Sequence, residues 1–114
     1  MICDDREGIR ESLKVIISDH YDIVLTNDGF QCLDALAHAK DIGAVLLDIK
    51  MPIRDGLDVL KEIKQRYPHV KIIMITGYES TDTATEAIRC GAAGYIVKPF
   101  KAEEVLATVK EVVG

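Results

Sequence analysis

Short apolar runs alternate along this chain with stretches in which apolar residues recur every three or four positions. A short apolar run bounded by Gly, Pro or acidic residues is typical of a buried strand, and the three-to-four spacing is typical of an amphipathic helix. The predicted strands cover residues 1–3, 23–25, 44–48, 70–75 and 95–97. The predicted helices cover residues 6–19, 30–37, 57–67, 81–90 and 102–113.

Each predicted helix has an apolar face that should pack against the sheet. In chain order, the predicted inward residues are Ile9, Leu13, Ile16 and Ile17; Phe30, Leu33 and Ala37; Leu57, Leu60 and Ile63; Ala84, Ala87 and Ile88; and Ala102, Leu106, Val109 and Val113. The helix over residues 81–90 has the weakest pattern. We therefore expect it to be the least firmly packed of the five.

Five strands that alternate with five helices predict an α/β fold: a single doubly wound (βα)5 domain over residues 1–114. The crossovers between parallel strands should be right-handed, so that helices cover both faces of the sheet. The sequence contains no internal repeat, low-complexity tract or linker that would divide it. At 114 residues the chain can bury a core without disulfide bonds.

The composition narrows the classes of partner. The net charge is −5 and no basic stripe interrupts the sequence, which argues against direct contact with nucleic acid. There is no 18-residue apolar run and no signal peptide, so we expect a cytoplasmic domain without membrane contact. Cys3, Cys32 and Cys90 match no metal-binding spacing and are interpreted as reduced residues in or near the core.

Polar residues follow the predicted strands at the points where the strands end. Asp4 and Asp5 end the first strand, Asp48 ends the third, Thr76 ends the fourth and Lys98 ends the fifth. A single acid in such a place often only opens a turn. Parallel strands end at one edge of the sheet, however, so all of these side chains could surround one pocket, where ligands of such sheets bind.

The charges of this set suggest its chemistry. Two carboxylates about 4 Å apart repel by about 4 kcal/mol at an effective dielectric constant near 20, so three of them need a counter-ion. Mg²⁺ prefers oxygen ligands and commonly binds one or two carboxylates together with phosphate. Asp48, held between this ion and the Lys98 ammonium, could attack phosphorus and become an aspartyl phosphate.

These residues closely resemble the receiver domain of two-component response regulators. The resemblance spans the whole chain, and the motifs that carry it are Asp4-Asp5, Leu46-Leu47-Asp48, Met51-Pro52 with Gly56, Thr76-Gly77 and Lys98-Pro99-Phe100. It implies a flavodoxin-like sheet with strand order 2-1-3-4-5. It also implies a signalling switch that catalyses only its own phosphorylation and dephosphorylation, rather than an enzyme.

The resemblance assigns a role to each site residue. Asp48 would be the phosphoacceptor and, with Asp5, a direct ligand of Mg²⁺, for which Mn²⁺ could substitute. Asp4 would act mostly through a metal-bound water, and the backbone carbonyl of Lys50 would be a further ligand. Lys98 would pair with the phosphoryl oxygens.

Four further positions acquire roles through the same resemblance. Thr76 would bind the phosphoryl group and move inward, and Tyr95 would be the aromatic switch residue whose rotamer follows. Pro99 would be preceded by a cis peptide bond. Lys50 and Tyr78, two positions after the phosphoacceptor and after Thr76, would tune the lifetime of the phosphorylated state; both are bulky, which predicts slow autodephosphorylation.

The implied partners are a sensor histidine kinase or phosphotransfer protein as the donor and an output domain or partner protein as the receiver of the signal. The output surface would comprise the predicted helix 81–90, the strand 95–97 and the last helix, and a homodimer could form through the same face. The sequence departs from the family at its start, where only three apolar residues precede Asp4. The first strand is therefore either short or truncated, which puts metal affinity in doubt.

Two other classes share part of this pattern. A phosphatase of the haloacid dehalogenase type also uses a strand-end Asp and Mg²⁺, but it needs a second acid two residues later, where this chain has Lys50. A flavodoxin-like cofactor module shares the topology. Its phosphate loop should be rich in Ser, Thr and Gly, whereas Asp4 and Asp5 would repel a phosphate here.

Overall fold

A five-stranded parallel sheet with strand order β2-β1-β3-β4-β5 forms the centre of the fold. The structure is a computed structural model, and it describes residues 1–39, 41–49, 55–77 and 81–113. The strands are β1 (Ile2–Cys3), β2 (Leu25–Thr26), β3 (Ala44–Asp48), β4 (Lys71–Thr76) and β5 (Gly94–Val97). The helices are α1 (Glu7–Ile17), α2 (Gly29–His38), α3 (Gly56–Arg66), α4 (Thr81–Arg89) and α5 (Ala102–Val113). The predicted fold class and strand order are confirmed.

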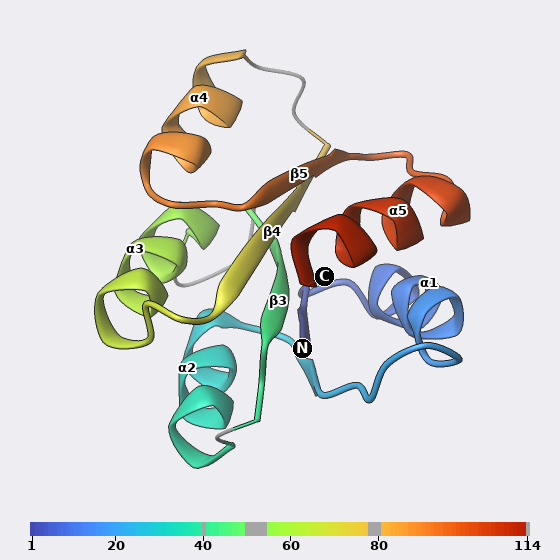
Figure 1. The fold of residues 1–114 in the computed structure, drawn as a ribbon, viewed down its shortest axis with the longest axis horizontal. Coiled ribbons are helices and arrows are strands. Elements are labelled where there is room, and N and C mark those ends of the chain that lie inside the picture. The colour runs from blue at the N-terminus through green and yellow to red at the C-terminus, as the bar shows by residue number, and fades with distance from the viewer. Residues whose placement is uncertain (40, 50–54, 78–80, 114) are drawn as a thin grey trace.

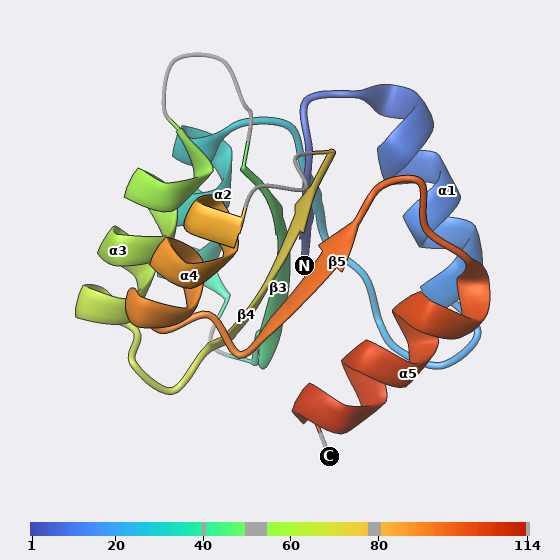
Figure 2. The same ribbon diagram turned by 90° about the horizontal axis from the view of Figure 1, so that it is seen from above.

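Helices cover both faces of the sheet. Helices α2, α3 and α4 lie on one side, and α1 and α5 lie on the other (Figures 1 and 2). Each strand packs side chains against both layers of helices, because successive side chains of a strand point to opposite faces of the sheet. In β3, Val45 and Leu47 belong to the core under α2 and α3, whereas Leu46 belongs to the core under α1 and α5.

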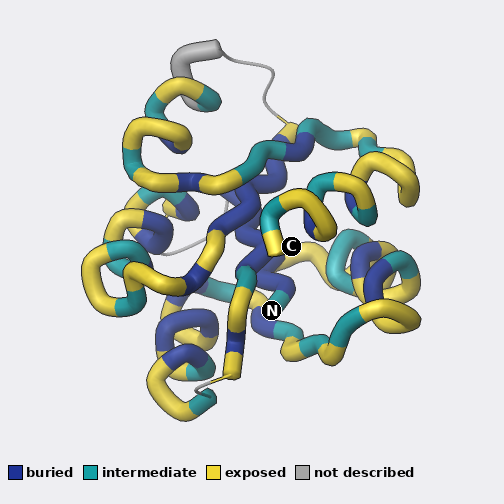
Figure 3. The backbone as a smooth tube through the Cα atoms, viewed as in Figure 1, coloured by how far each residue is buried: buried dark blue, intermediate teal, exposed yellow. Residues whose placement is uncertain are grey.

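The strands are the most deeply buried part of the molecule. They form the dark centre of Figure 3, while the outer surfaces of the helices are exposed. In β4, Ile72, Ile73, Met74 and Ile75 are all at most 1% exposed, as expected for a parallel sheet covered on both faces. This rigid layer carries the strand ends at which the polar residues lie.

The predicted inward faces of α1 and α3 are confirmed. Leu13 and Ile17 of α1 are buried, as are Leu60 and Ile63 of α3. Helix α3 ends at Arg66, two residues before Pro68, as expected because proline cannot continue a helix.

The predicted face of α2 is confirmed at Leu33 but wrong at Phe30 and Ala37. Phe30 is 55% exposed and Ala37 is also exposed, whereas Cys32, Leu33 and Leu36 are buried. The apolar residues of α2 fit two helical faces, which are related by a small rotation about the helix axis. Contact with the sheet determines which of the two faces is buried.

The same rotation occurs in α5. The predicted Val109 is buried, and so is Val105, which was not predicted. Ala102 is exposed and Val113 is 46% exposed, so the prediction was wrong at these two residues. In α4, Ala87 is buried but Ile88 is 55% exposed. Helices rich in alanine and valine on several sides leave the choice of face to tertiary packing.

The second strand was also predicted too early. It was expected over residues 23–25 but is observed at Leu25–Thr26, and Val24 is 41% exposed. Strand β2 lies at the edge of the sheet and pairs only with the short β1. Its length is therefore set by its neighbour rather than by its own apolar run.

Two of the three cysteines lie in the core, as predicted. Cys3 and Cys32 are buried, and Cys90 is partly buried. The Cys32 thiol donates a hydrogen bond to Cys3, and this bond together with burial raises the pKa of Cys32, so this group stays protonated. Within the described part of the chain, no helix has the length and apolar character needed to cross a lipid bilayer.

Candidate functional site

The parallel register brings the predicted site residues to one edge of the sheet. Cys3 is paired with Leu47, so the residues that follow them, Asp4 and Asp48, emerge side by side. Thr76 closes β4 next to Val97 of β5, which is followed by Lys98. The parallel register therefore places the ends of these four strands at one edge of the sheet.

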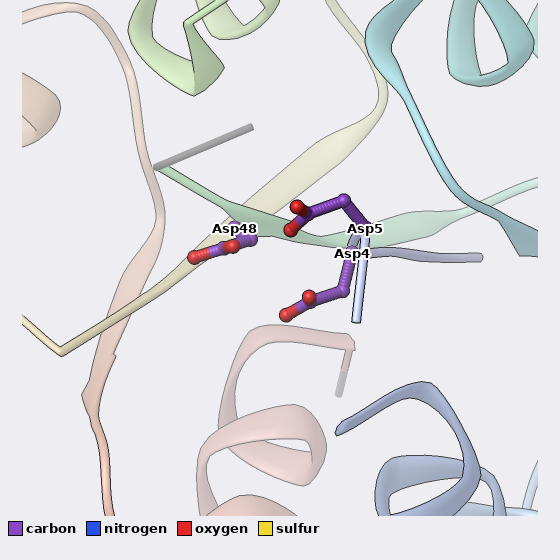
Figure 4. Close-up of side chains that lie close together, drawn as sticks. All are labelled: Asp4, Asp5 and Asp48. Carbon is purple, nitrogen blue, oxygen red and sulfur yellow. The ribbon is translucent and has the colours of Figure 1, made fainter. Parts of the chain in front are cut away.

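Three carboxylates meet at this edge. Oxygen atoms of Asp4, Asp5 and Asp48 all lie within 4.8 Å of one another. Figure 4 shows the side chains of Asp4 and Asp5 extending from the end of β1 toward the side on which Asp48 lies. Asp4 and Asp48 are buried and Asp5 is exposed, so two acids sit in the floor of the site and one lies at its rim.

Lys98 supplies a positive charge to the two buried acids. Its Nζ lies 3.2 Å from Oδ2 of Asp4 and 3.4 Å from Oδ1 of Asp48. The lysine side chain is only 13% exposed, so these interactions are less screened by water and salt than surface ion pairs are. One ammonium nevertheless faces three carboxylates, and the site retains an excess of negative charge.

Asp4 is fixed in this position by the backbone. Its N–H donates to the Thr26 carbonyl oxygen at 3.2 Å, which attaches it to β2. Its Oδ1 accepts a hydrogen bond of 2.9 Å from the backbone N–H of Arg6, at the start of α1. The orientation of the carboxylate is thus determined by chain geometry and by Lys98 together.

Thr76 and Tyr95 are connected across neighbouring strands. Thr76 is completely buried at the end of β4, and its side chain is hydrogen-bonded to the hydroxyl of Tyr95, which is half-buried on β5. Burial raises the pKa of Tyr95, and the hydrogen bond to Thr76 acts in the opposite direction. A change at Thr76 can therefore be transmitted directly to an aromatic side chain on the edge strand.

The start of α3 packs closely under the phosphoacceptor candidate. Gly56 donates its N–H to the Ile49 carbonyl oxygen at 2.7 Å. A Cβ atom at this glycine would overlap the carbonyl oxygen of Asp48 and lie 2.6 Å from Cα of Ile49. Asp55 caps the helix: its Oδ1 accepts a hydrogen bond of 2.8 Å from the Leu57 N–H.

The donor set fits a hard divalent cation. All candidate ligand atoms are carboxylate oxygens, two of the acids are buried, and the acid excess is unbalanced by Lys98 alone. Mg²⁺ binds such oxygen ligands and keeps several waters, for which the exposed Asp5 leaves room. Sulfur or imidazole ligands, which softer metals prefer, do not belong to this cluster.

A cavity lies at the opposite edge of the sheet. It has a volume of about 350 Å³ and is lined by Met1, by Asp22 to Val24 and by Asp41 to Ala44, which precede β2 and β3. These are the amino ends of the strands, at the sheet edge opposite the carboxylates. The site at the carboxyl ends is therefore recognised by its charges rather than by its volume.

Receiver domains, phosphatases of the haloacid dehalogenase type and flavodoxin-like cofactor modules share part of this pattern. Similarity to a known family decides between them. A family model described as the response regulator receiver domain matches residues 1–110. The chain belongs to this family. Receiver domains are the phosphoacceptor modules of two-component signalling, so this receiver domain functions in phosphorylation-dependent signal transduction.

Curated relatives are longer proteins. The transcriptional regulatory protein ZraR of Klebsiella oxytoca is 38% identical over 91 residues, which cover 80% of this chain and 20% of ZraR. The response regulator MprA of Mycobacterium sp. (strain KMS) is 33% identical over 111 residues, covering 96% of this chain and 48% of MprA. The receiver domain described here therefore spans less than half the length of either relative.

Solved structures of receiver domains have the same fold. The receiver domain of NtrX from Brucella abortus superposes with a TM-score of 0.92 at 33% identity, covering 98% of this chain and 95% of that one. A CheY-like response regulator receiver domain protein from Methanospirillum hungatei JF-1 gives a TM-score of 0.90 at 30% identity, with 96% and 88% covered.

Some predicted site residues lie outside the described residues. These are Lys50 and Tyr78, to which ligand and lifetime roles were assigned, and the Met51-Pro52 motif. The peptide bond between Lys98 and Pro99 is described and is cis, in agreement with the prediction.

Sequence reasoning missed two contributions to the receiver site. It assigned no role to Arg10, whose guanidinium contacts the Asp4 carbonyl, and it did not explain why position 56 must be glycine. The first could have been suspected, because Arg10 lies one helical turn into the helix that follows the acidic pair. The second depends on a contact between β3 and the start of α3 that no local pattern reveals.

Proposed function

We propose that Asp48 of this receiver domain accepts a phosphoryl group from the phosphohistidine of a sensor kinase or phosphotransfer protein. The observation that supports this most directly is the convergence of Asp4, Asp5 and Asp48 with Lys98 at one sheet edge. One strand-end acid would be unremarkable. Three acids and one ammonium, brought together from three separate strands, form a site for a cation and a phosphoryl group.

The chemical step is an in-line transfer. A carboxylate oxygen of Asp48 forms a bond to phosphorus while the bond between phosphorus and the donor's imidazole nitrogen breaks, and the electron pair stays with that nitrogen. The product is an acyl phosphate on Asp48 and a neutral histidine on the donor. Asp48 needs no general base, because it is already ionised when it acts as nucleophile.

The neighbouring residues hold the reacting groups. Asp5 and Asp48 would bind Mg²⁺ directly, Asp4 through a water, and the backbone carbonyl of Lys50 would complete the protein's ligands. A bound Mg²⁺ or Mn²⁺ would supply positive charge to the phosphoryl oxygens. Lys98, which is next to Asp48, would shift from its contact with Asp4 toward a phosphoryl oxygen.

Phosphorylation would then act as a switch through Thr76 and Tyr95. The Thr76 hydroxyl would exchange its hydrogen bond with Tyr95 for one with a phosphoryl oxygen. Only the arrangement in which this contact forms gains that interaction, so phosphorylation would favour it over the other arrangement. Tyr95, released from Thr76, would adopt a different rotamer on the edge strand.

The output surface would be the face formed by α4, β5 and α5. Strand β5 is an edge strand, and among the described side chains of α4 only Ala87 is buried. Few buried contacts are typical of an element that moves at low energetic cost. An output domain, a partner protein or a second copy of this domain would read the change there.

The phosphoacceptor assignment is tested with acetyl phosphate and beryllofluoride. In Mg²⁺ buffer the wild-type chain should gain one phosphoryl group, measured by intact-protein mass spectrometry, and Asp48→Asn should gain none. Asp34→Asn, which changes an exposed acid on α2, serves as the matched control and should behave as wild type. Labelling that persists in Asp48→Asn would contradict the proposal.

Two further measurements address the remaining assignments. We expect no turnover of p-nitrophenyl phosphate, since the proposed site transfers a phosphoryl group only to itself and then loses it. The bulky side chains of Lys50 and Tyr78 predict slow loss of the label in Mg²⁺ buffer. Complete loss within seconds would contradict that lifetime assignment without affecting the identity of the phosphoacceptor.

A further inference from the structure

The peptide group between Asp4 and Asp5 is held by side chains and backbone from two elements. The N–H of Asp4 is bonded to β2 through Thr26, and the carbonyl oxygen of Asp4 accepts a hydrogen bond of 2.9 Å from Nη1 of Arg10. Arg10 lies on α1 and is half-buried. This carbonyl belongs to the peptide bond that joins the two acids, so its direction determines where Asp5 leaves the chain.

We propose that Arg10 is a positioning residue for the cation site: by holding the Asp4 carbonyl, it keeps the Asp5 carboxylate directed toward Asp48. This inference rests on the proposed function, because it assumes that the three acids bind Mg²⁺. Asp4 is fixed independently by Arg6 and Lys98. Asp5 is exposed, and the backbone on its two sides is held by the hydrogen bond from Arg10 to the Asp4 carbonyl and by the hydrogen bond from the Arg6 N–H to the Asp4 carboxylate.

Arg10 could affect Mg²⁺ binding through its positive charge or through its hydrogen bond to the Asp4 carbonyl, and the two effects can be distinguished. A guanidinium near three carboxylates repels an incoming cation, so removal of its charge alone should strengthen Mg²⁺ binding. Removal of a positioning hydrogen bond should weaken it, since partners that orient metal ligands commonly contribute 10- to 100-fold to metal affinity. The two explanations therefore predict effects of opposite sign.

The residues around Arg10 include acids that balance its charge. The residue shares a polar cavity of about 260 Å³ with Glu7, Glu11, Asn27 and Gln31, between α1 and the loop after β2. Two of these neighbours, Glu7 and Glu11, are acids, and their charges offset part of the charge of the guanidinium. Its hydrogen-bond geometry then remains as its main contribution to the cation site.

The test compares Arg10→Met with Lys14→Met, which removes the same charge from an exposed side chain of the same helix. We would measure Mg²⁺ binding by isothermal titration calorimetry and the Mg²⁺ dependence of labelling by acetyl phosphate. Lys14→Met should bind Mg²⁺ as tightly as wild type or slightly more tightly. Arg10→Met should bind about 10-fold more weakly. Its half-saturating Mg²⁺ concentration should rise, with a maximal labelling rate close to that of wild type.

A conservative variant guards against a folding defect. Arg10→Lys keeps the charge and a hydrogen-bond donor group and should recover part of the lost affinity. Circular dichroism in metal-free buffer reports whether each variant is folded. Binding by Arg10→Met and Arg10→Lys that is as tight as that of wild type would overturn the positioning role alone. Absence of Mg²⁺ binding by the wild-type chain would overturn the proposed cation site and this inference with it.

Discussion

The ammonium nitrogen of Lys98 lies 3.2 Å from Oδ2 of Asp4, and the two residues are 94 positions apart in the sequence. Lys98 is thus closer to the acid proposed as an indirect metal ligand than to the proposed phosphoacceptor, at 3.4 Å. In this arrangement the lysine compensates charge that a divalent cation would otherwise compensate. Metal binding and the position of Lys98 should therefore be energetically coupled.

Lys98→Met should make the fold more dependent on Mg²⁺. Without the lysine, three neighbouring carboxylates lose their protein counter-charge, so the variant should unfold at a lower temperature than wild type in metal-free buffer. Added Mg²⁺ should raise its melting temperature by more than it raises that of wild type. Differential scanning fluorimetry across a Mg²⁺ titration measures both effects.

The control for this prediction is Lys101→Met, which removes the same charge from an exposed residue at the start of α5. It should respond to Mg²⁺ as the wild-type chain does. An identical Mg²⁺ response of Lys98→Met and Lys101→Met would show that Lys98 and the cation do not share the same carboxylates.

Gly56→Ala should destabilise the domain and disturb the phosphoacceptor. The added methyl group would overlap the carbonyl oxygen of Asp48, so either β3 or the start of α3 must shift. Overpacking of this kind costs about 1–3 kcal/mol of unfolding free energy, which urea denaturation measures. Gly8→Ala is the matched control, because nothing lies within 4 Å of its added methyl group and alanine favours the helix. Equal stability of the two variants would contradict the close contact.

Tyr95→Phe should change the dependence of stability on alkaline pH. The pKa of Tyr95 is raised in the folded protein, mainly by burial, so the folded state retains the phenolic proton more strongly than the unfolded state does. The resulting stabilisation is complete below the unfolded value of about 10 and is lost as pH rises through the folded-state pKa.

The wild-type chain should therefore lose more unfolding free energy than Tyr95→Phe above about pH 10, whereas the two should run parallel near neutral pH. Urea denaturation at a series of pH values measures this. Tyr67→Phe removes a hydroxyl from a tyrosine distant from Thr76 and should leave the wild-type pH profile unchanged. Parallel profiles of wild type and Tyr95→Phe at every pH would be the contrary result.

Lys64→Met should weaken the connection between α3 and β4. Lys64 donates from Nζ to the carbonyl oxygens of Pro68 at 2.9 Å and of Val70 at 3.1 Å. Methionine keeps an apolar stem against Gly91 but leaves both carbonyls without this donor. We expect a loss of about 1–2 kcal/mol in urea denaturation, and little change in the exposed Lys71→Met. A smaller loss in Lys64→Met than in Lys71→Met would refute the bridging role.

The local sequence pattern predicted the order of the strands and helices, and it named the acids and the lysine that meet at one edge of the sheet. The apolar runs that end in Asp48 and Thr76 predicted both the strands and the edge at which their polar residues meet. This worked because strands of a parallel sheet all end at the same edge, so sequence order translates directly into spatial proximity.

The sequence pattern did not predict the buried face of a helix where two faces fit the apolar spacing equally well. Phe30 and Ala37 fit a helical face as well as Cys32 and Leu36 do, and only contact with the sheet selects the second pair. The same holds for α5, whose Val105 replaces the predicted Ala102 in the core. The sequence pattern predicts that a helix forms. The rotation of that helix about its own axis depends on contacts with residues that are distant in the sequence.

The sequence by itself therefore determined the alternation of strands and helices, the parallel sheet and the identity of Asp4, Asp5, Asp48, Thr76 and Lys98 as site candidates, because these depend on short-range periodicity and on topology. Tertiary structure alone decided which acid Lys98 contacts, why Gly56 has no room for a side chain, and that Arg10 reaches the Asp4 carbonyl. Those features depend on distances between atoms of separate elements, which are fixed only when the helices have packed against the sheet.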